Sequence, residues 1–299
     1  MRKDPSYNIN VRSWGDKWRS YRNRKRSLAL FVAVAAAAVL VSAVVLFIIG
    51  YVLVMGVPNL RWSLFSWRYD SHNVSMLPAI LNTVELTLVT LLIAAPLGVV
   101  TAIYLVEYAP PGSRVVRFIR LAIETLAGIP SIVYGLFGFL AFVVALGWGY
   151  SMAAGAFTLA IMVLPLLIRT TEEALLTVPR SYREASYGLG AGKLRTVFCV
   201  VLPSAVSGVF SGLVLAVGRI VGESAALIFT AGTVAKFTGS LTASARSLAV
   251  HLYCLLSEGL YIEEAYATAV VLLVVVIGMN ALSGYAAGKL AERSAPGNG

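Results

Sequence analysis

The sequence predicts an all-α membrane protein with six transmembrane helices. Of its 299 residues, 59% are hydrophobic and only 13% are charged, which is more apolar material than a soluble domain buries. Two stretches carry no charge at all: thirty residues from Leu28 to Val57 and forty-four from Thr125 to Ile168. A helix needs about 20 apolar residues to cross the hydrocarbon core of a bilayer. These runs also lack the two-residue alternation of a membrane β-barrel, so the spans are predicted to be helices.

The first transmembrane helix is predicted within 28–57, after a basic tail over 1–27. A basic tail before an apolar run is also typical of a secretory signal peptide. The apolar core of a signal peptide, however, is roughly 7 to 15 residues long, which is much shorter than this run. We therefore expect an uncleaved helix whose N-terminal tail stays in the cytoplasm.

The second long apolar run is predicted to form a helical hairpin, because forty-four residues exceed one span. Near its middle, Gly147, Trp148, Gly149 and Tyr150 offer a turn with aromatic side chains suited to the membrane interface. We expect a core domain over 77–288 and a C-terminal tail over 289–299. The predicted spans are 28–55, 77–106, 121–146, 152–170, 204–232 and 265–288.

The distribution of basic residues predicts the orientation. With the N-terminus inside, nineteen of the 24 Lys and Arg residues fall on the cytoplasmic side, whereas four fall outside, at Arg61, Arg68, Lys236 and Arg246. Six spans then place both termini in the cytoplasm and the chain in the cell (inner) membrane as a multi-pass protein. The net charge of +10 follows from this bias, and its spread over several loops leaves no basic stripe for nucleic acid.

The titratable residues exclude an enzyme that cleaves bonds within the membrane. Such chemistry needs a Ser beside a His, or two Asp, at membrane depth. Both His72 and His251 lie outside the predicted spans, and no Asp lies within one. Neither Cys199 nor Cys254 has metal-ligand spacing, so no metal site is predicted.

A glycine-rich segment from Tyr187 to Leu194 superficially resembles a phosphate-binding loop. That loop needs a Gly five residues before its Gly-Lys pair and a Ser or Thr after it, and here those positions hold Tyr187 and Leu194. Any ATP that drives this protein is therefore expected to bind another chain.

Charge at membrane depth marks a candidate site. If the fifth span covers 204–232, Arg219 lies near its midpoint, with Glu223 four residues on. A central Arg costs about 2.5 to 3.5 kcal/mol on insertion scales, so it usually faces a bundle interior or an aqueous path. Two interpretations remain open. The two residues could form an ion pair that only joins helices, or Arg219 could present its donors to an oxyanion while Glu223 keeps that anion from being held too tightly.

Arg169, at the cytoplasmic end of the fourth span, is a second candidate anion contact. Glu172 and Glu173 follow it by three and four residues, a spacing that brings side chains together on one helix face. Simple pairing on an exposed helix surface is therefore an equal alternative for Arg169.

The cytoplasmic loop predicted over 171–203 carries a specific pattern. Its residues are Glu184, Ala185, Ser186, Gly190, Leu202 and Pro203. Their order and spacing resemble the E-A-A, three residues, G, nine residues, I-x-L-P pattern of the permease subunits of ATP-binding-cassette (ABC) importers. The resemblance extends over most of the chain and implies the type I ABC importer permease architecture.

Within these permeases the chain resembles the phosphate branch, the PstA-like permeases. The segment from Gly218 to Ala225 is similar to the G-R-x-x-G-E-[TS]-A motif of that branch, which associates the positions of Arg219 and Glu223 with transport. Parts of 96–108 and the segment from Leu126 to Gly135 resemble the same branch. The chain departs from the family's usual residues at Ser186, Val200 and Ala226.

The resemblance implies a non-catalytic membrane subunit with several partners. These are a second homologous permease (PstC-like), two ATPase subunits (PstB-like) that bind ATP and Mg, an extracytoplasmic phosphate-binding protein (PstS-like) and membrane lipid. This chain would bind no cofactor. Glu184 and Gly190 would be central to ATPase coupling, and the extracytoplasmic segment 236–264 would face the binding protein. Phosphate would enter the cytoplasm by alternating access; the alternative is an importer for another oxyanion or polar solute.

Overall fold

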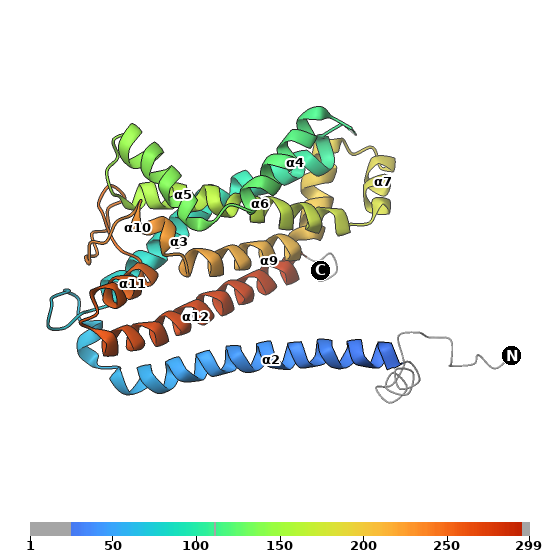
Figure 1. Ribbon diagram of the computed structural model, residues 1–299. Coiled ribbons are helices and arrows are strands. Elements are labelled where there is room, and N and C mark those ends of the chain that lie inside the picture. The colour runs from blue at the N-terminus through green and yellow to red at the C-terminus, as the bar shows by residue number, and fades with distance from the viewer. Residues whose placement is uncertain (1–24, 111, 295–299) are drawn as a thin grey trace. The chain divides into compact units, whose positions relative to one another are not determined.

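The computed structural model describes residues 25–110 and 112–294, and all regular structure in these residues is helical (Figure 1). The predicted all-α class is therefore confirmed. The chain divides into two compact units, 1–54 and 55–299. Most of the basic tail predicted over 1–27 lies outside the described residues.

Helix α2, Lys25–Gly56, includes all described residues of the first unit and ends two residues beyond it. From Leu28 onward it contains no charged residue, and most of its side chains are exposed. Its bounds match the first predicted transmembrane helix within three residues. An apolar helix with exposed side chains is suited to a lipid environment, where no polar face is needed.

In the described residues, five helices are long and apolar enough to cross a membrane, and one bent pair makes a sixth. Helix α6 lies centrally and packs against α3, α9 and the bent pair. Leu159, Val163 and Leu167 of α6 are fully buried in the main hydrophobic core together with Ile220 of α9. The long helices after α2 are α3 (Leu77–Ile103, continued by a π-helical turn, Tyr104–Tyr108), α6 (Met152–Thr177), α9 (Leu202–Val221) and α12 (Ile262–Ser294).

The third predicted span, 121–146, is wrong as a continuous helix. Helix α4, Arg114–Ala127, and helix α5, Ser131–Gly138, meet at a bend of 105°, and a π-helical segment, Phe139–Ala145, continues α5. The bend falls at residues 128–130, where Pro130 has an extended backbone (φ −61°, ψ 144°). Proline lacks a backbone donor and disfavours helical geometry in the residue before it, so the helix stops here although the apolar pattern continues.

The fifth predicted span, 204–232, is also wrong at its C-terminal end. Helix α9 ends at Val221, and a separate short helix, α10 (Ala225–Ile228), follows. At the other end, α8 (Lys193–Thr196) and a π-helical turn, Val197–Val201, lead directly into α9. The span is therefore shifted toward the N-terminus and covers residues 193–221.

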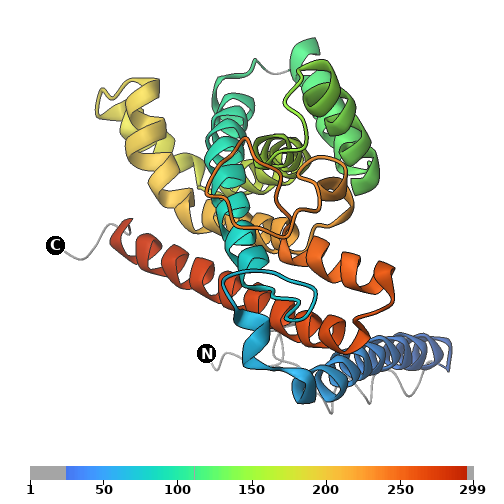
Figure 2. The ribbon, with the colours of Figure 1, turned by 90° about the vertical axis from the view of Figure 1, so that its left-hand side faces the viewer.

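The predicted hairpin turn is present before α6. Gly147 and Gly149 both adopt positive φ angles, +67° and +64°, which glycine reaches without steric cost. The segment 229–247 lies over the same end of the second unit (Figure 2). There the carbonyls of Leu241 and Ala243 accept the first amides of α6, Ala153 N and Met152 N, at 2.8 and 3.0 Å. These bonds satisfy donors that a helix N-terminus leaves unpaired.

The predicted extracytoplasmic segment 236–264 contains a short helix, α11 (Leu248–Glu258). Leu248, Val250, His251 and Leu255 are buried, so this apolar run packs into the unit. Helix α12 begins at Ile262 and continues to Ser294, beyond the predicted end at 288. The tail predicted over 289–299 is therefore helical through 294, and residues 295–299 lie outside the described residues.

Candidate functional site

Three arginines and three glutamates line one cavity of about 410 Å³ among α4, α6 and α9. Its apolar lining includes Met162, Pro165 and Leu166 of α6. The cavity brings together Arg169 and Arg219, which are fifty residues apart in sequence and were predicted separately as pathway residues. The charged lining residues are Arg120, Glu124, Arg169, Glu172, Glu173 and Arg219.

Arg219 lies in the last turn of α9 and not at the midpoint of a span, so that part of the prediction is wrong. Its side chain is exposed within the chain and reaches the cavity. Among the described residues, Arg219 forms no ion pair. A guanidinium without a carboxylate partner keeps its donors available to an anion.

Glu223 lies beyond the end of α9 and does not pair with Arg219 in this structure, which corrects the predicted helical ion pair. Its Oε1 instead accepts a hydrogen bond from Ala226 N at 3.2 Å, in the first turn of α10. A carboxylate at this place satisfies an unpaired helix amide and favours the new helix start. Glu223 thereby holds the chain where it turns immediately after Arg219.

Arg169 combines both interpretations that the sequence left open. Its Nε lies 3.3 Å from Glu173 Oε1, one helical turn on, and its side chain also lines the cavity. Both side chains of this pair are more than 60% exposed, and an exposed pair at this spacing holds its partners weakly. Arg169 can therefore leave Glu173 for an anion at little cost.

Arg120 of α4 was missed by the sequence reasoning. Its Nη2 contacts Glu172 Oε1 at 2.5 Å, and the Glu172 side chain is only 14% exposed. The residue was counted as a cytoplasmic cation because it precedes the predicted third span. The sequence shows the arginine, but neither its place in α4 nor its contact with α6 was predicted, because the contact depends on how the bent pair packs.

The predicted coupling loop forms its own small helix, α7 (Arg180–Gly188). Helix α6 continues to Thr177, so the predicted boundary of 171 for this loop is too early. Glu184 and Ala185 are exposed on α7. Leu202 and Pro203 form the first turn of α9, where proline is tolerated because the first helical amides have no partner.

Gly190 ends α7 through a positive φ angle of +82°. Gly190 N donates to Tyr187 O at 2.9 Å and Ala191 N donates to Ser186 O at 3.1 Å. This pair of bonds is the Schellman motif, in which glycine occupies the left-handed position after the helix. The glycine of the sequence pattern therefore sets where α7 stops.

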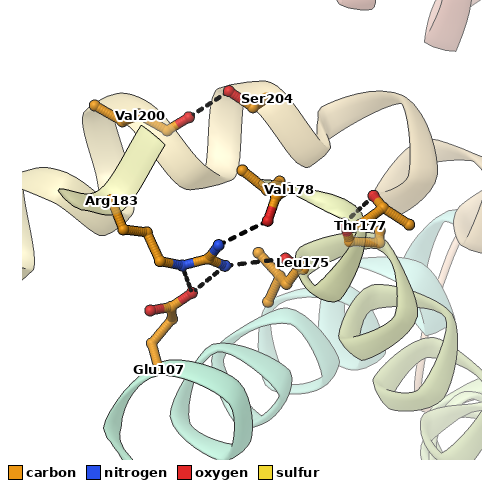
Figure 3. Close-up of polar contacts among 8 residues, drawn as sticks. Glu107, Leu175, Thr177, Val178, Arg183, Val200 and Ser204 are labelled. Atoms are coloured by element: carbon orange, nitrogen blue, oxygen red, sulfur yellow. Dashed lines mark hydrogen bonds and ion pairs between the residues drawn. The ribbon is translucent and has the colours of Figure 1, made fainter. Parts of the chain in front are cut away.

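Ser186 is buried and explains one departure from the usual pattern. Its Oγ lies 2.8 Å from Thr196 Oγ1, so a hydroxyl pair fastens α7 to α8. On the same face of α7 as Ser186, the Arg183 side chain extends inward to Glu107 in the π-helical turn that ends α3 (Figure 3). Neither Arg183 nor Glu107 was predicted as a site residue, because a contact across 76 residues has no local sequence signal.

Comparison with known proteins decides the family. Residues 94–291 match the family described as binding-protein-dependent transport system inner membrane component. The chain belongs to this family. Membership confirms the predicted resemblance to ABC importer permeases and identifies a multi-pass protein of the inner membrane.

Several permease relatives align with most of this chain. The Bacillus subtilis probable ABC transporter permease protein YqgI is 35% identical over 247 residues, covering 78% of this chain and 83% of the relative. The Mycobacterium tuberculosis phosphate transport system permease protein PstA 2 is 37% identical over 212 residues, covering 71% and 69%. Phosphate transport system permease protein PstA of Yersinia pestis is 36% identical over 203 residues, covering 66% and 68%.

Solved ABC importers share the fold. A bacterial alginate ABC transporter, in complex with its alginate-bound periplasmic protein, aligns with a TM-score of 0.62 at 16% identity, covering 92% of this chain and 99% of that one. An inward-facing MetNI methionine ABC transporter aligns with a TM-score of 0.52 at 19% identity, covering 73% and 93%. These likenesses confirm the predicted type I ABC importer permease architecture.

Proposed function

We propose that this chain is the permease subunit of an ATP-driven importer that carries inorganic phosphate into the cytoplasm. The observation that carries the proposal is Arg219, a guanidinium without an ion-pair partner among the described residues, facing a cavity that also holds Arg169 and Arg120. The permeases named for phosphate transport, at 36 to 37% identity, support phosphate as the solute.

Arginine is suited to this task because its planar donors match the oxygens of a phosphate. The cavity also contains Glu124, Glu172 and Glu173, so its formal charge is balanced. This balance favours passage over trapping, since a transport path must bind its solute weakly enough to release it. Phosphate would meet Arg219 as the free cation and displace the exposed Arg169–Glu173 pair as it moves on.

Helix α7 supplies the surface for an ATPase subunit. Glu184 and Tyr187 are exposed on it, and Leu189 and Leu194 on either side of Gly190 are 90% and 66% exposed. Large apolar side chains that are exposed beside a polar helix are typical of a protein interface. ATP and Mg²⁺ would bind two such ATPase subunits, and this chain would bind no cofactor and hydrolyse no ATP.

A second homologous permease would complete the path, and an extracytoplasmic phosphate-binding protein would deliver the anion. The segment 229–247 and α11 lie at the opposite end of the second unit from α7 (Figure 1). With α7 in the cytoplasm, that end would face the binding protein, and an even number of spans would leave both termini in the cytoplasm. ATP-driven movement of α7 would then open the cavity alternately to either side.

The direct test is phosphate uptake by proteoliposomes that contain the whole complex. Arg219→Gln should assemble, hydrolyse ATP and lose most uptake, while Arg219→Lys should retain charge but lose the planar donor arrangement and transport more slowly. Arg117→Gln on α4 is the matched control because Arg117 is exposed and does not line the cavity. Normal uptake by Arg219→Gln would overturn the proposed role of Arg219. If excess sulfate inhibited uptake as strongly as excess unlabelled phosphate, phosphate would be wrong as the solute.

A further inference from the structure

Arg183 is anchored more firmly than its neighbours on α7 (Figure 3). Its Nε and Nη2 both donate to Glu107 Oε1, at 2.9 and 2.7 Å. Nη2 also donates to Leu175 O at 3.0 Å, and Nη1 donates to Val178 O at 2.8 Å. The side chains of Arg183 and Glu107 are only 16% and 6% exposed, so both charges are withdrawn from water and depend on each other.

The acceptors of Arg183 belong to two other helices. Glu107 lies in the π-helical turn that ends α3, and Leu175 lies in the last turn of α6, with Val178 directly after that helix. Carbonyls at a helix C-terminus have no partner within the helix and attract a positive charge. One guanidinium thus joins the coupling helix to the cytoplasmic ends of α3 and α6.

The two faces of α7 differ in how they are held. Arg183 and Ser186 are three residues apart, which places them on one helix face, and both are bonded inward. Glu184 and Tyr187, one residue further on in each case, are exposed. The inner face is fastened to the membrane helices, and the outer face is free for a partner.

We propose that Arg183 is a positioning residue that makes α7, α3 and α6 move as one body when the ATPase moves. The inference rests on the proposed function of α7 as the ATPase contact. A push on α7 moves α3 and α6 only if the joint between them is stiff, and a buried set of four charge-assisted hydrogen bonds is stiffer than apolar contact alone. Loss of the joint should leave ATP hydrolysis running without transport.

The experiment measures phosphate carried per ATP hydrolysed by the reconstituted complex. Arg183→Lys keeps the charge but cannot reach all three acceptors, and Glu107→Gln removes the opposite charge. Each should lower the ratio roughly five- to tenfold, in the usual range of coupling between sites. Arg117→Gln, an exposed change on α4 that lies outside both α7 and the cavity lining, is the control and should behave as wild type.

A second measurement reads the joint without reference to the solute. Spin labels on Ser181→Cys and Val100→Cys, exposed positions on α7 and on α3, are introduced after Cys199 and Cys254 are replaced by Ser. In the wild-type background the label-to-label distance should be the same without nucleotide and with ATP bound. With Arg183→Lys it should change or broaden on ATP binding.

The outcomes separate this inference from the proposed function. If the wild-type complex carries no phosphate, the proposed solute is wrong, yet the distances still decide whether α7 and α3 move together. An unchanged ratio and unchanged distances in Arg183→Lys and Glu107→Gln would overturn the inference. It is also overturned if none of these variants assembles, because Arg183 would then serve folding alone.

Discussion

Arg120 of α4 and Glu172 of α6 form an ion pair at 2.5 Å on the wall of the cavity that Arg219 also lines. Arg169 is paired with Glu173 in the same wall. Two of the three arginines are thus neutralised, and Arg219 is left without an ion pair among the described residues. The pattern of pairing, more than the number of arginines, determines how strongly the cavity attracts an anion.

This pairing predicts the effect of Glu172→Gln. The change frees Arg120, so two unpaired guanidiniums face the cavity and phosphate should be held longer. We expect a lower half-saturating phosphate concentration together with a lower maximal uptake rate, each by roughly threefold, a coupling of somewhat under 1 kcal/mol. Glu263→Gln is the control, because it breaks an exposed pair with Arg61, and neither residue lines the cavity. A parallel loss of uptake in both variants would contradict the prediction.

Glu223 should act through its oxygen and not through its charge. Glu223→Gln keeps a side-chain oxygen that can accept the Ala226 amide, so uptake and stability should remain close to wild type. Glu223→Ala removes the acceptor and should destabilise the segment after α9 by about 1 kcal/mol, as the loss of a helix cap does. Thermal unfolding of the purified complex in detergent and uptake assays check both variants. A large transport defect in Glu223→Gln would instead favour the tuning role inferred from the sequence.

The apolar runs predicted the fold well because long helices in lipid need little beyond length and hydrophobicity. The two errors have a common cause. Apolar residues continue after Pro130, and after Gly222, Glu223 and Ser224 they resume from Ala225, so average hydropathy stays high across both helix breaks. Pro130 was a visible signal for the first break, whereas the second is accompanied by a hydrogen bond that Ala226 N donates to Glu223 Oε1, for which the sequence has no local pattern.

The candidate site was predicted in part for similar reasons. Arg219 and Arg169 could be named from their chemistry and position, since charge near a membrane span is costly. That they share one cavity, and that Arg120 joins them, follows only from the packing of α4 against α6. In the sequence, Glu107 and Arg183 had no feature that distinguished them from other cytoplasmic charges, and only the fold shows that they form an ion pair.

Tyr134 should stabilise the bend between α4 and α5. Its hydroxyl donates to Leu126 O at 2.7 Å, across the break at 128–130. Tyr134→Phe keeps the ring in its buried position but leaves the carbonyl without this donor, which should cost about 1 kcal/mol. Relative to wild type, hydrogen exchange in Tyr134→Phe should accelerate more in residues 126–134 than in α6. The control is Tyr150→Phe, because Tyr150 is exposed outside this bend, and equal exchange in both variants would contradict the prediction.

His251 should make the α11 region sensitive to acid. The side chain of His251, in α11, is fully buried, and the centroid of its ring lies 6.1 Å from that of Tyr69. The guanidinium carbon of Arg246 lies 4.5 Å from the centroid of the same Tyr69 ring. Burial, with the charge of Arg246 as a second cause, lowers the pKa of His251 from 6.5 to about 3. Between pH 3 and pH 6.5, His251 therefore binds a proton in the unfolded chain but not in the folded chain. Stability is therefore constant above pH 6.5 and falls as the pH drops from 6.5 toward 3.

Between pH 7.5 and pH 5 the folded α11 region should lose about 2 kcal/mol, the cost of protonating an ordinary imidazole only in the unfolded state. His251→Phe removes the titrating group and keeps a ring against Tyr69, so its stability should change much less over this range. Hydrogen exchange of the α11 amides at the two pH values measures the difference. His72→Phe is the control, because His72 is exposed, and it should retain the wild-type pH dependence. An identical pH dependence in His251→Phe and wild type would show that His251 is not the group responsible.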